Sequence, residues 1–550
     1  MFCFRASAVA AMVAACMFPI PAAAQQGPEM QAVSPLDRDR PDRSDPVSQP
    51  EVPPADTQAP GPPVAVEIAA EENAPPIRSI DFAGASVPQV VAEAAYAFVG
   101  QRPTRSNIQA LAEAMTEAYK RSDVALFTLA IPQQDLSDGK LTVRVAEGHI
   151  EAVILTGETE GRSHPLVVNY AEKLRSEKPL SRRTMERYIS LMRDIPGLSV
   201  KSRMDLGRTP GGVRLILDLD YSKTKLTFSY DSRSTRLISG GQAEAKLEVP
   251  RLLRDGDQTI VTTAASPNLS SLLFAGINHS TPLGGEGARL SLSFGHLETK
   301  PQDSMIEGAA DSASLSVSYP FIRSYRSRLD LGFSADLIDS DNSALGSLIA
   351  SEKVRALRAS LGYNDRKAKQ VIGGRLTLSQ GIDALGASVL PSRGKASFRK
   401  VTGAASYNRQ IGEEFFARLN VSGQYADDAL PVSERFSVGG SRIGRAFERG
   451  LISADRGLGA SLELAARPLS GDFSRSEIYG FGDYAIAGFR PRPGTPAQTF
   501  DLASLGAGLR ATWTEKVTVG VEGARVIDRP FATYEGNWRV TFYWALQFRP

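Results

Sequence analysis

The sequence predicts a transmembrane β-barrel of about sixteen antiparallel strands, preceded by two small α+β domains. Helical periodicity is confined to residues 77–222, and beyond Lys223 apolar and polar residues alternate in successive stretches to the C-terminus. A soluble β-sandwich produces the same alternation, so the length of the stretches decides between the two folds. They run about ten residues or more, the membrane-crossing length of a tilted strand, whereas soluble strands average about five or six.

The N-terminus has the pattern of an export signal. Arg5 precedes an apolar run that ends in small residues, so residues 1–24 are predicted to be a signal peptide cleaved after Ala24. A lipoprotein-type cleavage before Cys16 is the alternative, but the residues after Cys16 remain apolar, as inside a signal. The other cysteine is Cys3, so cleavage after Ala24 leaves no thiol for disulfides or zinc sites.

Three segments are predicted between the signal and the barrel. Residues 25–76 are rich in proline and charge without apolar periodicity, which predicts a periplasmic linker. Residues 77–148 and 149–222 each follow the order β-α-α-β-β, about seventy residues apart. From periodicity alone, a generic pair of small α+β domains fits this repeat equally well.

Capping residues set the expected helix starts in the two units. In the first, Ser106 with Gln109 forms a capping box. In the second, Pro165 fits the first position of one helix and Ser181 caps the other.

Residues 223–550 are predicted to form the barrel, and an even strand count lets it close without a lipid-exposed edge. The last stretch alternates most strictly, with one face made of Trp538, Val540, Phe542, Trp544, Leu546 and Phe548. Long connections are expected to follow odd-numbered strands, at residues 299–311, 340–351, 383–397 and 427–457. The connections after even-numbered strands are mostly tight.

A glycine-rich stretch at residues 436–463 is the central motif of the predicted barrel. It lies between alternating segments at 415–425 and 458–466, which predicts a long loop after the eleventh barrel strand. Downstream, a strand is expected at 476–486. Phe481 and Asp483 lie two residues apart in it and therefore point to the same face.

These motifs resemble those of the two-partner secretion transporters of the haemolysin secretion/activation family, which are outer-membrane barrels with two periplasmic POTRA domains. In that family a loop folds into the barrel lumen, here expected at residues 428–457. A loop tetrad there meets a motif on the inner wall. The tetrad aligns with Gly444, Arg445, Ala446 and Phe447, and the wall motif with Phe481, Asp483 and Ala485. Alanine replaces both motif glycines here, and glycine replaces the branched first residue of the tetrad.

The resemblance implies a transporter and no enzyme. An unfolded partner exoprotein is captured in the periplasm and passed outward through the barrel, while Arg445 pairs with Asp483 to hold the loop. Capture is expected along an exposed POTRA edge by strand addition, with Phe127, Leu129 and Ile131 as candidate client-binding residues. The transporter is expected in contact with outer-membrane lipid, as a monomer or weak dimer.

Two alternative functions share parts of this pattern. An assembly factor for other barrel proteins shares the motifs but commonly has more repeats, and a passive solute porin needs neither POTRA units nor an in-folded loop.

The net charge of +2 indicates no nucleic acid partner. The four histidines are scattered singly, so no metal and no cofactor is expected; they are His149, His164, His279 and His296.

Overall fold

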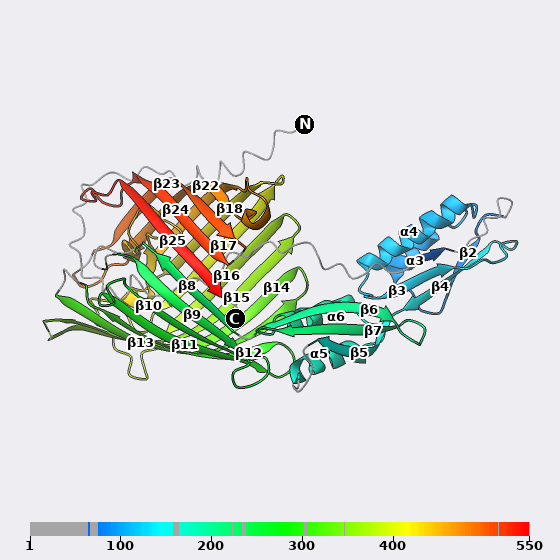
Figure 1. Ribbon diagram of the computed structural model, residues 1–550, viewed down its shortest axis with the longest axis horizontal. Helices are drawn as coiled ribbons and strands as arrows, with labels where there is room; N and C mark the ends of the chain where they lie inside the picture. The colour runs from blue at the N-terminus through cyan, green and yellow to red at the C-terminus, as the bar shows by residue number, and fades with distance from the viewer. Residues whose placement is uncertain are drawn as a thin grey trace.

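The computed structural model describes residues 64–66, 75–157, 164–222, 224–233, 238, 240–301, 305–345, 347–494, 496–514 and 516–548. A β-barrel forms one end of the molecule, and two small α+β units extend from it in a row (Figure 1). The predicted signal peptide, 1–24, lies outside the described residues, as does most of the predicted linker. No helix among the described residues has the length and apolar composition to cross a membrane.

The first unit has the predicted β-α-α-β-β order. Its elements are β2 (Ser79–Ala83), α3 (Gln89–Tyr96), α4 (Arg105–Arg121), β3 (Phe127–Ile131) and β4 (Lys140–Glu147). The helices pack their apolar stripes on one face of the sheet, where Leu111, Met115 and Val143 are fully buried. Within the predicted linker, β1 (Val64–Val66) adds a further strand, so the sheet order is β1-β3-β4-β2.

One predicted helix start in this unit is wrong. The N-cap of α4 is Thr104, whose hydroxyl accepts from the Asn107 amide at 3.3 Å, and Ser106 lies inside the first turn. Threonine supplies the same capping chemistry as serine. The helix therefore starts directly after the extended residue that follows Pro103.

The second unit repeats the order. Its elements are β5 (His149–Gly157), α5 (Pro165–Ser176), α6 (Arg182–Arg193), β6 (Leu198–Leu206) and β7 (Gly212–Tyr221), with sheet order β5-β7-β6. Both predicted helix starts are confirmed, because Pro165 begins α5 and Ser181 accepts from the Thr184 amide at 3.2 Å.

In the described part of the chain, sixteen antiparallel strands close into the barrel, as predicted. β25 pairs with β8 to complete the ring, from Tyr543 opposite Asp231 to Phe548 opposite Leu226. The strands are β8 (Lys225–Asp231), β9 (Gln242–Pro250), β10 (Gln258–Ala265), β11 (Leu272–Leu283), β12 (Ala288–Thr299), β13 (Ile306–Arg323), β14 (Ser327–Ala344), β15 (Ser347–Lys367), β16 (Gln370–Gly381), β17 (Arg399–Ile411), β18 (Phe415–Ala426), β21 (Arg456–Ala466), β22 (Glu477–Phe489), β23 (Gln498–Trp513), β24 (Val517–Asp528) and β25 (Trp538–Phe548).

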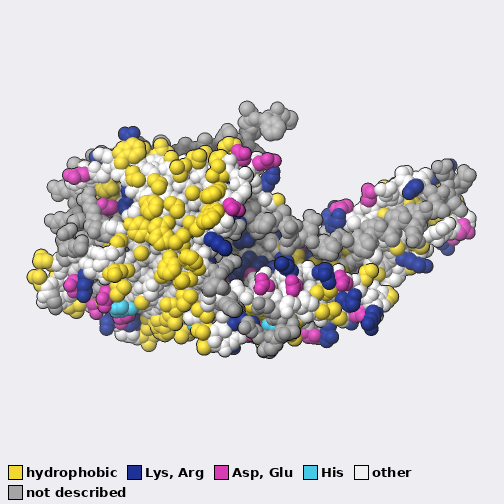
Figure 2. Space-filling view, in the orientation of Figure 1, with side chains coloured by type: hydrophobic (Ala, Val, Ile, Leu, Met, Phe, Trp, Pro, Cys, Tyr) yellow, Lys and Arg dark blue, Asp and Glu magenta, His cyan; other side chains and the backbone are white. Residues whose placement is uncertain are grey.

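The barrel turns its apolar face outward. On β25 the side chains of Trp538 and Val540 are 66% and 74% exposed, whereas Thr541 between Val540 and Phe542 is 2% exposed. Hydrophobic side chains gather over the visible barrel wall (Figure 2). This distribution is what a lipid-facing wall requires, and it confirms the predicted face of the last strand.

Two of the four predicted long connections are largely strand. β13 starts at Ile306, and only residues 345–346 separate β14 from β15. Their polar composition predicted loops, but cross-strand pairing satisfies the backbone whatever the side chains are. Asp341 lies opposite Ala309 on one side and Ser351 on the other. The two remaining long connections leave the ring at residues 382–398 and 427–455.

The second unit rests directly on one end of the barrel. Arg187 of α6 donates to the carbonyl oxygens of Pro320 and Glu286, both at 3.0 Å. At the end of α6, Asp194 accepts two hydrogen bonds from Arg323, each 2.7 Å long. Charge-assisted, bidentate contacts of this kind fix orientation as well as distance, so the unit is held against the barrel.

Candidate functional site

The connection between β18 and β21 folds into the barrel. On β21 and β22, exposed Leu462 and Leu464 alternate with buried Glu463, and exposed Tyr484 follows buried Asp483, so the buried polar residues face the lumen. The connection contacts these lumen-facing residues. It carries a short 3₁₀ helix, η2 (Val432–Glu434), and a hairpin of β19 (Phe436–Val438) with β20 (Ile452–Ala454), which packs on β21 and β22.

The backbone amides at the tip of this loop bind the Asp483 side chain of β22. The Asp483 carboxylate accepts from the Gly444 amide at 2.7 Å, the Arg445 amide at 3.4 Å and the Ser504 hydroxyl at 2.6 Å. Gly444 has φ +77°, and an added Cβ there would lie 3.1 Å from Leu502. Glycine therefore suits both the left-handed backbone and the close approach to the wall.

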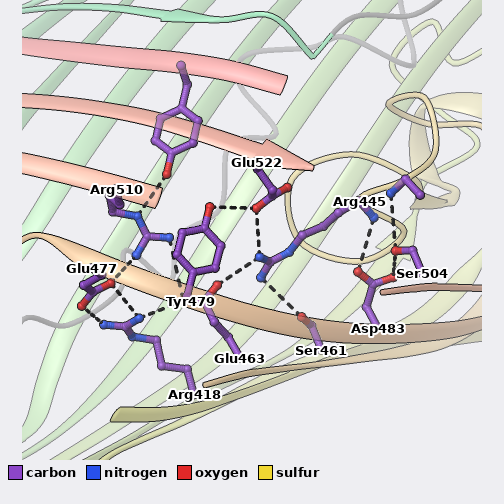
Figure 3. A network of polar contacts seen from close by, with 12 residues as sticks. Arg418, Arg445, Ser461, Glu463, Glu477, Tyr479, Asp483, Ser504, Arg510 and Glu522 are labelled. Carbon is purple, nitrogen blue, oxygen red and sulfur yellow. Dashed lines mark hydrogen bonds and ion pairs between the residues drawn. The ribbon is translucent and has the colours of Figure 1, made fainter. Parts of the chain in front are cut away.

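The expected ion pair between Arg445 and Asp483 does not form. The Arg445 guanidinium instead lies 3.0 Å from Glu463 of β21 and 3.2 Å from Glu522 of β24, and it donates to Ser461 at 3.4 Å (Figure 3). The oxygens of Asp483 already accept from nearby amides and a hydroxyl, and the long arginine side chain extends past them. The two motifs meet as predicted, with different partners for the charges.

The other motif residues build the apolar part of the contact. The Phe481 ring lies under the Arg445 guanidinium, 4.1 Å from centroid to carbon, a cation–π arrangement. Ala446 and Phe447 are buried, and the Phe447 ring lies 5.3 Å from that of Tyr534.

Ala485 occupies a position that is glycine in the family motif. It is buried on β22 directly opposite Gly459 of β21. A Cβ on Gly459 would lie 3.3 Å from that of Ala485 and 2.7 Å from Ile443. The glycine is therefore found on the neighbouring strand, which leaves room for the alanine and for the loop.

A polar network surrounds the tip, and the sequence prediction missed it. Glu463 also binds Arg418 at 2.8 Å, Glu522 accepts from Tyr479 at 3.0 Å, and Glu477 binds Arg510 at 2.6 Å. Buried charges on a wall are stabilised only when paired and hydrogen-bonded. The sequence signal was available, since these glutamates occupy inward positions of strands whose outward positions are apolar.

The base of the loop is attached to another part of the wall. Glu434 of η2 lies 2.7 Å from Arg358 of β15 and 2.7 Å from Lys400 of β17. Glu352 of β15 accepts from the Val432 amide at 3.0 Å and the Ser433 amide at 3.2 Å. The attachments of the loop therefore include one at its base, to β15 and β17, and one at its tip, to β21 to β24.

The tip also connects to the strands that close the ring. Glu522 lies 3.1 Å from Arg233, which follows β8, and Arg233 lies 3.2 Å from Asp231 at the end of β8. Arg449 of the loop donates to Gln242 of β9 at 3.1 Å. The loop thus contacts both sides of the closure between β25 and β8.

The candidate client-binding side chains are in the wrong place for that role. Phe127, Leu129 and Ile131 are 6%, 2% and 2% exposed, and Phe127 stacks on Tyr119 at 4.4 Å. All three point toward the helices of the first unit. Strand alternation predicted their shared face correctly but could not show that helices cover it. These three side chains are therefore not accessible to a client.

Two families match the chain. Residues 278–511 match the family described as haemolysin secretion/activation protein ShlB/FhaC/HecB, and residues 76–148 match the POTRA domain, ShlB-type. The heme/hemopexin transporter protein HuxB of Haemophilus influenzae (strain 86-028NP) is 21% identical over 459 residues, covering 78% of this chain and 79% of HuxB. The outer membrane transporter CdiB of Dickeya dadantii (strain 3937) is 23% identical over 358 residues, 60% of each chain.

Solved structures share the fold. CdiB from Escherichia coli gives a TM-score of 0.70 at 18% identity, covering 92% of this chain and 94% of that one. BamA from Haemophilus ducreyi lacking POTRA domains 1-3 gives a TM-score of 0.51 at 13% identity, covering 86% and 100%.

Proposed function

We propose that the chain is a two-partner secretion transporter of the outer membrane, with POTRA domains in the periplasm, and that its client enters as an unfolded polypeptide captured on the POTRA domains. HuxB is named for heme and hemopexin; for this chain we propose a secreted exoprotein as the cargo. The POTRA domains supply backbone edges, which bind extended chains by adding a strand.

The observation that carries the proposal is the loop in the lumen, which is attached to the barrel wall at its base and at its tip. Its attachments at Glu434 and Arg445 are ion pairs between buried or half-buried side chains, and a translocating chain has to replace them as the loop moves aside. Water and the client backbone supply replacement hydrogen bonds for these polar partners, while the apolar contacts of the tip, such as Phe447 on Tyr534, have to separate as well. We propose a monomer as the transporting unit, because one chain supplies the closed ring and both small α+β units.

Reconstitution tests this function. Purified full-length transporter in liposomes, without nucleotide, is given a urea-unfolded secretion domain of a candidate exoprotein. The expected result is protease-protected exoprotein on the far side, absent from protein-free liposomes. Passage of small sugars at a porin's rate without any polypeptide transfer would contradict the proposal.

A further inference from the structure

The strand β1 occupies a backbone edge of the first POTRA domain. Val64–Val66 pairs in parallel with β3, with Val64 opposite Leu129, Ala65 opposite Ala130 and Val66 opposite Ile131. This segment lies inside the proline-rich stretch that composition predicted to be a linker, immediately after Pro62 and Pro63. Proline has no amide hydrogen, so these residues limit how far the pairing extends in that direction.

Without β1, β3 would be an edge strand. The sheet order β1-β3-β4-β2 leaves no other neighbour on that side of β3. The side chains of Phe127, Leu129 and Ile131 are buried on the helical face, so an incoming chain finds backbone groups there. Such an edge accepts an extended segment with little regard to its side chains, and left open it also promotes aggregation.

The pairing of β1 is short. It covers three residues, whereas the parallel pairing of β2 with β4 runs from Ser79 to Ala83 and that of β5 with β7 from His149 to Gly157. Among the described strand pairs of the two POTRA units it is the shortest. β3 itself has five residues, so a longer extended segment has more of the strand to pair with than β1 uses.

We infer that Val64–Val66 is a built-in occupant of the client edge, which an extended, β-prone segment of the exoprotein replaces by parallel pairing with β3. The inference rests on the proposed capture of an unfolded client. It assigns β1 two tasks: it covers the edge between clients, and it yields that edge when a client arrives.

A reversible crosslink tests the replacement. Ala65→Cys with Ala130→Cys places thiols on directly paired residues, and Ala130 is only half-buried, on the face opposite Leu129, so the core is undisturbed. The matched control is Asp81→Cys with Thr142→Cys, which locks the parallel pair of β2 and β4. In full-length transporter we expect both disulfides to form, export to stop only with the first, and reduction to restore it.

A peptide measurement separates edge binding from export. The probe is a labelled synthetic peptide of residues 62–68, and the variant replaces Val64–Val66 with Gly-Ser-Gly in the full-length protein. The variant is expected to bind the peptide and the unchanged protein is not, because its edge is occupied. Equal binding to both, absence of the 65–130 disulfide, or full export by the locked transporter would each overturn the inference while leaving transport itself intact. If the unmodified transporter does not export the exoprotein at all, that result would instead contradict the proposed function.

Discussion

Arg445 of the loop lies 3.2 Å from Glu522 of β24, and this contact and the one with Glu463, rather than one with Asp483, join the loop charge to the barrel wall. Glu522 in turn binds Arg233 beside β8, so one carboxylate links the loop to the strands that close the ring. The position of the loop and the stability of the closure are therefore expected to respond together when Glu522 is changed.

A double-mutant cycle measures this link. Arg445→Met removes the cation from two buried glutamates and should destabilise the barrel by about 1.5–3 kcal/mol, the range of charge-assisted hydrogen bonds. Adding Glu522→Gln should recover part of that loss, with a coupling energy of about 0.5–3 kcal/mol. Stability is measured by the temperature at which the barrel loses its folded mobility on gels. The cycle of Arg445→Met with Asp483→Asn is the control and should show less coupling. Equal coupling in both cycles would contradict the geometry.

Asp483 is expected to act as a hydrogen-bond acceptor rather than as a counter-ion. Asp483→Asn keeps an oxygen for the Gly444 amide and should retain most export. Asp483→Ala leaves that buried amide without a partner, which costs about 1–3 kcal/mol, and should impair export clearly. Export assays at matched outer-membrane levels compare the two variants. An asparagine variant as defective as the alanine variant would show that the negative charge is required.

Either attachment of the loop is expected to hold it in the lumen when the other is lost. Glu434→Gln weakens the base and Arg445→Met the tip, and each alone leaves the other attachment in place. Single variants should change conductance in planar bilayers modestly, and the combined variant should open the pore far more than the two effects together. Exposed Glu413→Gln serves as the control. A fully open pore in either single variant would show that one attachment holds the loop.

The strand count and the loop position could be predicted because alternation is a local property of the sequence. The partners of Arg445 could not, because they depend on which residues of β21 and β24 reach the same height in the barrel, and register is set by the whole ring. β1 was missed for a related reason. Three residues directly after two prolines carry too little periodicity to predict a strand, and only the neighbouring β3 edge makes them one.

Deletion of residues 77–147 tests the division of labour between the domains. The barrel closes through its own strands, so the truncated protein should still insert and remain heat-modifiable. Export should be abolished because the client edge is lost. Sodium dodecyl sulfate gels of unboiled samples report the barrel, and exoprotein in the medium reports export. Undiminished export by the truncated protein would show that capture does not require the first POTRA domain.

The contact between the second α+β unit and the barrel is expected to depend on Glu286. Burial raises the pKa of Glu286, but hydrogen bonds from Lys173 at 2.8 Å and Tyr188 at 2.9 Å outweigh it and hold that pKa below its usual range. A depressed carboxyl pKa stabilises the contact above the unfolded-state pKa, and this contribution is lost as the pH falls through the folded-state value. The contact should therefore be constant from about pH 6 to 8 and loosen below about pH 4.

Spin labels on cysteines at Val168 and Leu253, which are 52% and 75% exposed, measure the distance between the domain and the barrel. Glu286→Gln with Asp194→Asn should broaden the distance distribution at neutral pH, because it weakens the Lys173 contact and the bidentate bond to Arg323. Glu172→Gln, in an exposed pair within α5, should leave it narrow. Each broken contact is partly exposed and is worth about 1 kcal/mol or less alone, so we expect the double variant to loosen the domain without releasing it. An unchanged distribution in the double variant would show that Arg187 and the apolar packing are enough to hold the domain.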